Sequence, residues 1–208
     1  MIVLHYTAMG DTRAARDWLC TPEAQVSAHY LVSTSGGLIQ MVAEDQRAWH
    51  AGAGRWGAVE DVNSRSIGVE ITNTGSQPFS EPQMAAVEAL LARIMARWGI
   101  APQRVIGHSD KAPGRKQDPG RRFDWRRLAR RGLSIWPDEI AGAPPDMAHF
   151  RALAAQVGYT AEVTDAVLLD AVRQRFRPWA TGALSLDDMA VVSDLAARFP
   201  VDRAGPSA

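Results

Sequence analysis

The segment from Gly107 to Gly120 constrains the fold of this chain most, because it cannot form one continuous helix. Its sequence, GHSDKAPGRKQDPG, is interrupted by prolines, which lack a backbone N–H, and by glycines, which add backbone entropy. We therefore expect a loop that carries His108 and Asp118. With one further imidazole, these side chains would form the kind of three-ligand set that holds catalytic zinc. A capped turn, with His108 hydrogen-bonded at a strand end, would fit the same residues.

Two predicted strands carry further candidates for such a site. Residues 2–6 form a short apolar run, and His5 lies near its end, either as the missing ligand or as a core histidine. In residues 66–71, Glu70 alternates with apolar residues and shares its face with Ser66 and Gly68, which leaves room for a ligand. Glutamate is uncommon in strand centres, so Glu70 is either a general acid–base group or an exposed strand residue.

The other patterns predict helices around these strands. We expect helices over residues 11–20, 80–98 and 123–131, a hairpin of strands 26–33 and 38–42, and a strand over 104–106. His29, on the first hairpin strand, fits ordinary sheet packing. His50, in the glycine-rich loop 49–54, either lines a pocket or is a capped loop histidine; this loop lacks the spacing of a phosphate-binding loop.

The composition of the chain narrows the classes of partner. The 208 residues include 23 basic and 23 acidic ones, so no global charge favours nucleic acid or an anionic membrane. Cys20 is the single cysteine, which excludes an intrachain disulfide. We see no membrane-spanning stretch and no signal peptide. We therefore expect a cytoplasmic protein, or a periplasmic or envelope protein if the N-terminus is trimmed.

The C-terminal part of the chain predicts a second, helical unit. Residues 136–146 are rich in proline and glycine and form a linker candidate between a domain at 1–135 and a domain at 147–200. Asp146, Thr164 and Ser185 each precede an amphipathic run and fit helix N-caps. Three short helices make a marginal core, so this unit either packs on the main domain or serves as a binding appendage.

Together these residues resemble the zinc-dependent N-acetylmuramoyl-L-alanine amidases of the AmpD/AmiD type, in the amidase-2, peptidoglycan-recognition-protein-like superfamily. The resemblance extends over residues 1–135 and rests on Leu4–Thr7 (LHYT), Val26–Tyr30 (VSAHY), Trp49–Gly52 (WHAG), Asn63–Glu70 (NSRSIGVE) and above all Gly107–Gly120. Arg65 departs from the AmiD-type pattern, which often has a small polar residue there. The C-terminal helices are similar to the small peptidoglycan-binding domain of that type.

The resemblance implies an α/β fold with a mixed central β-sheet flanked by helices, zinc in a surface groove and a small C-terminal three-helix domain. It implies one Zn²⁺ ion on His5, His108 and Asp118, with Glu70 as catalytic glutamate and Lys116 as catalytic lysine. The bond cleaved would join N-acetylmuramic acid, including its 1,6-anhydro form, to L-alanine of a peptidoglycan stem peptide during wall recycling or turnover.

Further residues are candidates for contacts with such a substrate. Arg115 would suit a peptide carboxylate through its two-pronged guanidinium. Tyr30, His50 and Asn73 are additional candidates. The expected partners are peptidoglycan fragments or polymer. An alternative remains: superfamily members that have lost a zinc ligand recognise peptidoglycan without cleaving it, although the full set of ligand positions here favours catalysis.

Overall fold

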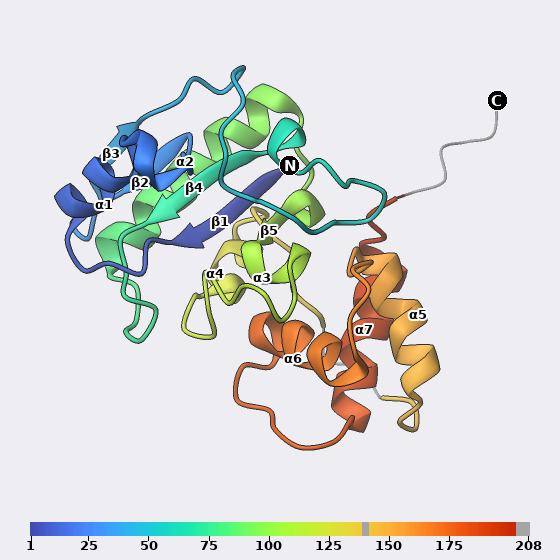
Figure 1. Ribbon diagram of the computed structural model, residues 1–208. Coiled ribbons are helices and arrows are strands. Elements are labelled where there is room, and N and C mark those ends of the chain that lie inside the picture. The colour runs from blue at the N-terminus through green and yellow to red at the C-terminus, as the bar shows by residue number, and fades with distance from the viewer. Residues whose placement is uncertain (139–141, 203–208) are drawn as a thin grey trace.

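A five-stranded mixed β-sheet forms the centre of the molecule in the computed structural model, which describes residues 1–138 and 142–202 (Figure 1). The strands are β1 (Ile2–Tyr6), β2 (Tyr30–Val32), β3 (Leu38–Gln40), β4 (Ile67–Ile71) and β5 (Val105–Gly107), in the order β3-β2-β4-β1-β5. Only β3 among these is antiparallel to its neighbour. The carboxyl ends of the other strands therefore meet at one edge, where α/β proteins commonly bind ligands. The predicted fold class is confirmed.

One face of the sheet is covered by the long helix α2 (Glu81–Trp98). The helix begins with a capping box of Ser80 and Gln83 and ends at Gly99, whose φ of 61° suits a residue without a Cβ. Its apolar stripe packs on the side chains that alternate toward this face from β1, β2 and β4. The shared core includes Leu4, Tyr30, Val69, Ile71, Val87, Leu91 and Ile94.

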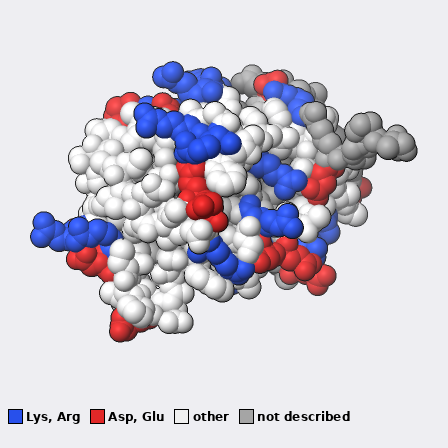
Figure 2. Space-filling view, turned by 90° about the horizontal axis from the view of Figure 1, so that it is seen from above, with Lys and Arg blue, Asp and Glu red and all other residues white. Residues whose placement is uncertain are grey.

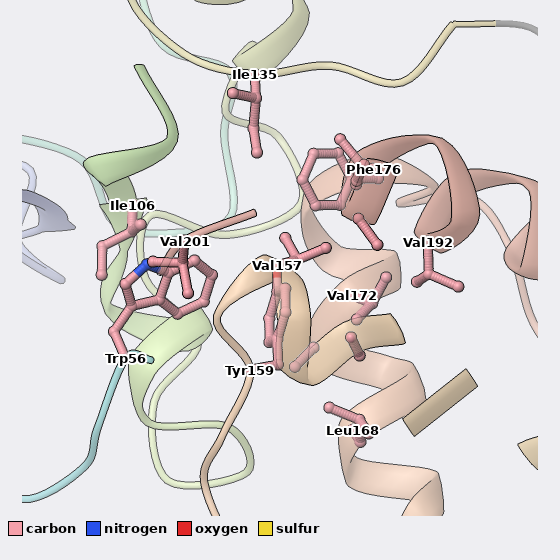
Figure 3. Close-up of a cluster of buried hydrophobic side chains, with 14 of the residues drawn as sticks. Trp56, Ile106, Ile135, Val157, Tyr159, Leu168, Val172, Phe176, Val192 and Val201 are labelled. Atoms are coloured by element: carbon pink, nitrogen blue, oxygen red, sulfur yellow. The ribbon is translucent and has the colours of Figure 1, made fainter. Parts of the chain in front are cut away.

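The opposite face carries the remaining strand side chains and the C-terminal helices α5 (Met147–Val157), α6 (Asp165–Phe176) and α7 (Leu186–Arg198). Their cores are continuous: Val3 and Ile106 of the sheet belong to the same buried cluster as Phe150, Val172 and Leu195 of the helices. Figure 3 shows Trp56 and Ile106 facing the side chains of these helices. The C-terminal helices thus share a hydrophobic core with the sheet. Residues 139–141 of the predicted linker lie outside the described residues.

Shorter elements complete the fold and correct some predicted boundaries. They are α1 (Thr12–Leu19), α3 (His108–Lys111), α4 (Trp125–Arg130) and the 3₁₀ turns Pro22–Ala24, Asn63–Arg65 and Pro102–Arg104. The hairpin strands are shorter than predicted, because Ser27 bonds to the loop at Trp49 instead of the neighbouring strand. The segment 107–120 is a loop only after its first turn: His108–Lys111 are helical, since the Asp110 carboxylate accepts from the Gly107 N–H at 2.7 Å.

The surface combines both signs of charge, as the balanced composition requires. Basic and acidic side chains lie beside one another on the face seen in Figure 2. Two arginines between residues 121 and 131 form ion pairs with acidic side chains: Arg121 with Asp170, and Arg127 with Glu81 and Glu88. Among the helices that the structure describes, none combines the length and apolarity needed to cross a membrane.

Candidate metal centre

Three side chains meet at the carboxyl edge of the sheet. His5 comes from β1, His108 follows β5, and Asp118 lies in the loop after α3. His5 Nδ1 lies 2.8 Å from Asp118 Oδ2 and 3.0 Å from His108 Nδ1, and His108 Nδ1 lies 3.0 Å from the same oxygen. All three residues are buried. Two imidazole nitrogens and one carboxylate oxygen around a common point form a donor set that suits a divalent transition metal.

The protonation of these groups also suits metal binding. Burial, with the neighbouring His5, lowers the pKa of His108 to about 4. Burial alone would raise the pKa of Asp118, but its close contacts with His108 and His5 hold it well below its ordinary value. Neutral imidazole and ionised carboxylate are the forms that ligate metals. His108 and Asp118 are therefore in the required state near neutral pH.

The carbonyl of Ala51 orients His108. His108 Nε2 lies 2.8 Å from this oxygen, which can only accept, so Nε2 carries the proton and Nδ1 presents its lone pair to the triad. The buried Lys111 donates to the carbonyls of Ala51, Gly52 and Ala53 at 2.8–3.0 Å and holds this loop in place. Nothing in the sequence singles out Lys111, because a lysine in a segment predicted to be a loop usually lies in solvent.

Glu70 stands beside the triad. It pairs in register with His5 across the adjacent strands β1 and β4. Its Oε2 atom is buried and receives no hydrogen bond from residues 1–138 or 142–202. Burial raises the pKa of Glu70 to about 7; Asp118 adds to this shift, and His5 and Lys116 oppose it. A carboxylate with an unused oxygen and a pKa near neutrality can take and return a proton.

A cleft of about 450 Å³ contains the triad, Glu70 and Lys116. Its walls differ in character. They include the apolar side chains of Met9, Trp18, Leu19 and Val26 as well as the polar side chains of Arg115 and Gln117. Arg115 lines the cleft, but its Nη2 donates to the carbonyls of Ala51 and Ala53, so part of its guanidinium holds the loop. A larger cavity of about 920 Å³ lies beside α6 and contains none of the triad residues.

Two predicted substrate contacts lie elsewhere. Tyr30 belongs to the α2 face, because strand side chains alternate, and its hydroxyl donates to Glu44 at 2.6 Å. Asn73 is buried; its amide donates to the carbonyls of Gln77 and Pro78 and its Oδ1 accepts from Gly75 N–H. Both side chains shape the protein itself, and neither lines the cleft.

The other two histidines of the sheet region are bound on both ring nitrogens. His29 bonds to the Gln46 carbonyl and to the Gly68 N–H, as expected for sheet packing. His50 lines the cleft, but its ring nitrogens contact His5 and Ser66. Its ring fills the space above Gly68, where the strand pattern predicts room for a ligand.

A buried ion pair connects the C-terminal helices to the triad loop. Arg175 of α6 donates to Asp110 of α3 at 2.6 Å, and both side chains are essentially inaccessible to solvent. Asp110 also accepts from the Tyr159 hydroxyl at 2.6 Å. Because Asp110 caps the turn that begins at His108, the C-terminal helices hold the backbone that carries this histidine.

Comparison with known proteins agrees with this geometry. Residues 1–121 match the family Amidase_2, described as N-acetylmuramoyl-L-alanine amidase. The amidase AmiD of Escherichia coli (strain K12) is 37% identical over 76% of this chain and 66% of that protein. The 1,6-anhydro-N-acetylmuramyl-L-alanine amidase AmpD of Haemophilus influenzae is 39% identical over 50% of this chain and 58% of that protein. The chain thus spans two thirds or less of these curated relatives.

Solved structures match nearly the whole chain. The complex of E. coli AmiD with the substrate anhydro-N-acetylmuramic acid-L-Ala-D-gamma-Glu-L-Lys superposes with a TM-score of 0.88 at 32% identity, covering 97% of this chain and 90% of that one. AmpDh3 of Pseudomonas aeruginosa gives a TM-score of 0.88 at 32% identity, covering 96% and 91%. With its triad, its fold and a family match over more than half its length, this chain belongs to the N-acetylmuramoyl-L-alanine amidase family Amidase_2.

Proposed function

We propose that this protein is a zinc-dependent N-acetylmuramoyl-L-alanine amidase. It hydrolyses the amide bond between the lactyl group of N-acetylmuramic acid and L-alanine of the stem peptide. The observation that carries this proposal is the triad of His5, His108 and Asp118 with Glu70 beside it in one cleft. A site built only to recognise peptidoglycan would have no need of a buried carboxylate with an unused oxygen.

The proposed substrates are muropeptides, including the 1,6-anhydro form. The support comes from relatives: AmpD of H. influenzae is named for the 1,6-anhydro compound, and AmiD was solved with an anhydro-muramyl tripeptide. The cleft has the mixed character that such a molecule needs, because sugar and alanyl groups present apolar faces and the stem peptide carries carboxylates. Cell-wall recycling or turnover is the corresponding role.

Zinc is the metal that the donor set fits best among common ions, since imidazole with one carboxylate is a usual catalytic zinc set. When bound, zinc acts as a Lewis acid on the amide carbonyl and makes water a stronger acid. His5, His108 and Asp118 would hold it. His108 is fixed by the Ala51 carbonyl, which directs its Nδ1 toward the other two ligand atoms.

Glu70 moves the proton in this proposal. As the oxygen of water attacks the carbonyl carbon, Glu70 accepts a proton from that water. It then delivers the proton to the amide nitrogen as the C–N bond breaks. The products are a lactyl carboxylate and the free amino group of L-alanine. The position of Glu70 beside His5, and its pKa of about 7 caused by burial, support both roles.

Lys116 stabilises the oxyanion that forms during this attack. It lines the same cleft as Glu70 and the triad. It lies two residues before Asp118, so binding of the metal by Asp118 keeps the ammonium group close to the reacting carbonyl. A donor of this kind typically contributes about 3–4 kcal/mol to transition-state stabilisation.

The test is mass spectrometry of 1,6-anhydro-N-acetylmuramyl tripeptide incubated with the protein. We expect release of the free L-alanyl peptide, loss of this activity with a chelator and recovery with zinc. If the protein releases no peptide from either the tripeptide or intact sacculi but binds them, it is a recognition module and the proposal is wrong. Release from sacculi alone would restrict the substrate to polymer.

A further inference from the structure

His50 connects the metal triad to the backbone through a chain of hydrogen bonds. His5 Nε2 lies 3.0 Å from His50 Nδ1, and His50 Nε2 lies 3.3 Å from Ser66 Oγ. Ser66 Oγ lies 2.5 Å from the carbonyl oxygen of Val62. This series of hydrogen bonds thus begins at His5 of the triad and ends at the backbone carbonyl of Val62. His5 and His50 are buried.

The Val62 carbonyl fixes the direction in which each hydrogen bond of this series is donated. Two oxygens 2.5 Å apart require a proton between them, and the carbonyl of Val62 has none, so Ser66 donates to it. The lone pairs of Ser66 Oγ then face His50, and His50 Nε2 must carry the proton to donate to them. His50 Nδ1 consequently has no proton and can only accept a hydrogen bond. His5 Nε2 must therefore carry a proton and donate it to His50 Nδ1.

We propose that His50 is a positioning residue that holds His5 in the Nε2–H tautomer and so presents its Nδ1 lone pair to the metal. This inference rests on the metal-binding role in the proposed function. His50 does for His5 what the Ala51 carbonyl does for His108, so two consecutive residues of one loop orient both ligand histidines. Partners that bond to the second nitrogen of a ligand histidine fix its tautomer and ring orientation.

The packing around His50 supports this role over that of a substrate contact. A Cβ on Gly68 would lie 2.4–2.6 Å from three atoms of the His50 ring, so the sheet accommodates this ring only above a glycine. The backbone N–H groups of His50 and Ala51 both donate to Asn63 Oδ1, at 3.0 and 2.8 Å. The ring is therefore fixed by its own backbone, by the sheet below and by hydrogen bonds at both nitrogens.

The first measurement is the tautomeric state in the unaltered protein. The chain has only five histidines, so ¹⁵N-histidine labelling and long-range ¹H–¹⁵N correlation spectra of the full chain, with and without zinc, resolve each ring. We expect protonated Nε2 and unprotonated Nδ1 in His50, and protonated Nε2 in His5. A proton on His50 Nδ1 would overturn the inference without any substitution in the protein.

The second measurement is zinc affinity by competition with a chromophoric chelator. His50→Phe keeps a ring but removes the acceptor, and we expect it to bind zinc about 10–100-fold more weakly. His50→Asn places an amide oxygen near the position of Nδ1, and we expect it to recover most of that affinity. Ser66→Ala, which removes the acceptor for His50 Nε2–H, should weaken binding less than His50→Phe does.

The outcomes separate this inference from the proposed function. If His50→Phe binds zinc as tightly as the unaltered chain, His50 does not position His5, while the amidase proposal stands. If the unaltered chain binds no zinc, the proposed function fails and this inference fails with it. Thermal unfolding of each variant shows whether it is folded; if His50→Phe is unfolded, the spectra of the unaltered chain and the Ser66→Ala affinity decide.

Discussion

At the scale of single residues, the structure gives different tasks to side chains that look alike in the sequence. Lys116 lines the cleft, whereas Lys111, five positions earlier, is buried beneath three carbonyls of the 51–53 loop. Glu70 has a buried oxygen without a partner in the described part of the chain, whereas Glu44 has its carboxylate fully occupied. These differences lead to distinct expectations for substitution.

Glu70→Ala should keep zinc and lose most turnover. Removing a general acid–base group typically lowers kcat by about 10²–10⁴-fold, while the ligand set remains intact. Zinc content of the purified variant, measured by mass spectrometry, checks the first part, and steady-state kinetics check the second. A variant that loses zinc together with activity would make Glu70 a ligand.

Lys116→Met and Lys111→Met form a matched pair. Lys116→Met should lower kcat by about 10²–10³-fold with little change in stability, because it removes a donor to the oxyanion. Lys111→Met should cost about 3 kcal/mol of unfolding free energy, because it leaves buried carbonyls without their donor. Kinetics and urea unfolding of both variants test the assignment. Equal losses of stability in the two variants would contradict it.

At the scale of secondary-structure elements, strand alternation decides which side chains reach the cleft. His5 and Glu70 point to the cleft face, while Leu4, Tyr30 and Val69 point to α2. The same rule places Gly68 under His50. Strand β4 therefore contributes to the site in two ways: Gly68 leaves space for the His50 ring, and Glu70 supplies the carboxylate.

Gly68→Ala should weaken zinc binding. The new Cβ would lie only 2.4 Å from Cγ of the His50 ring, so the ring would have to move. Alanine can adopt the backbone conformation of Gly68, so the effect comes from packing alone. Gly10→Ala is the control, since its Cβ would meet Thr74 at an ordinary 3.7 Å. Isothermal titration with zinc compares the two. Unchanged affinity in Gly68→Ala would mean that the His50 ring moves freely.

The contact between the turn after β3 and the end of α2 should make stability depend on pH. Hydrogen bonds from Arg97, with others from Tyr30 and Trp98, lower the pKa of Glu44 from 4.5 to about 2. Because the pKa of Glu44 is lower in the folded state than in the unfolded state, these hydrogen bonds stabilise the fold fully above pH 4.5. This stabilisation is lost as the pH falls toward 2. We expect the unfolding free energy to fall by on the order of 1–3 kcal/mol over this pH range, and Glu44→Gln should remove this pH dependence. Urea unfolding at several pH values is the measurement.

At the scale of the whole molecule, the C-terminal helices form part of the structure that holds the triad. The sheet and these helices share one buried cluster, seen in Figure 3, and the Arg175–Asp110 pair links α6 to the turn of His108. We therefore expect a single cooperative unfolding transition, because the C-terminal helices bury their apolar side chains in one cluster with Val3 and Ile106 of the sheet.

Arg175→Met should lower the unfolding free energy by about 3–5 kcal/mol, because it leaves Asp110 buried without its cation. Arg151→Met is the control: its pair with Asp165 is partly exposed, and its loss should cost less than about 1 kcal/mol. Denaturant unfolding followed by circular dichroism and by tryptophan fluorescence tests both points. Two separate transitions would show that the helical unit is independent.

The sequence by itself determined the elements and the identity of the candidate metal ligands. Proline and glycine interrupt the segment 107–120, alternation puts Glu70 opposite the apolar set, and Ser80 with Gln83 caps α2. These are local signals, which depend on residues close to one another in the chain. The triad could be named because its residues stand in motifs that resemble a family, although they are far apart in the chain.

Only the tertiary structure decided which side chains support that triad. Tyr30 and Asn73 were expected to contact substrate, but the register of β2 and the turn at 73–78 direct them elsewhere. The partners of His50, Lys111 and Arg175 are carbonyls, rings and carboxylates from distant segments. Such contacts follow from burial, where every polar group must find a partner, and the sequence alone does not specify which one.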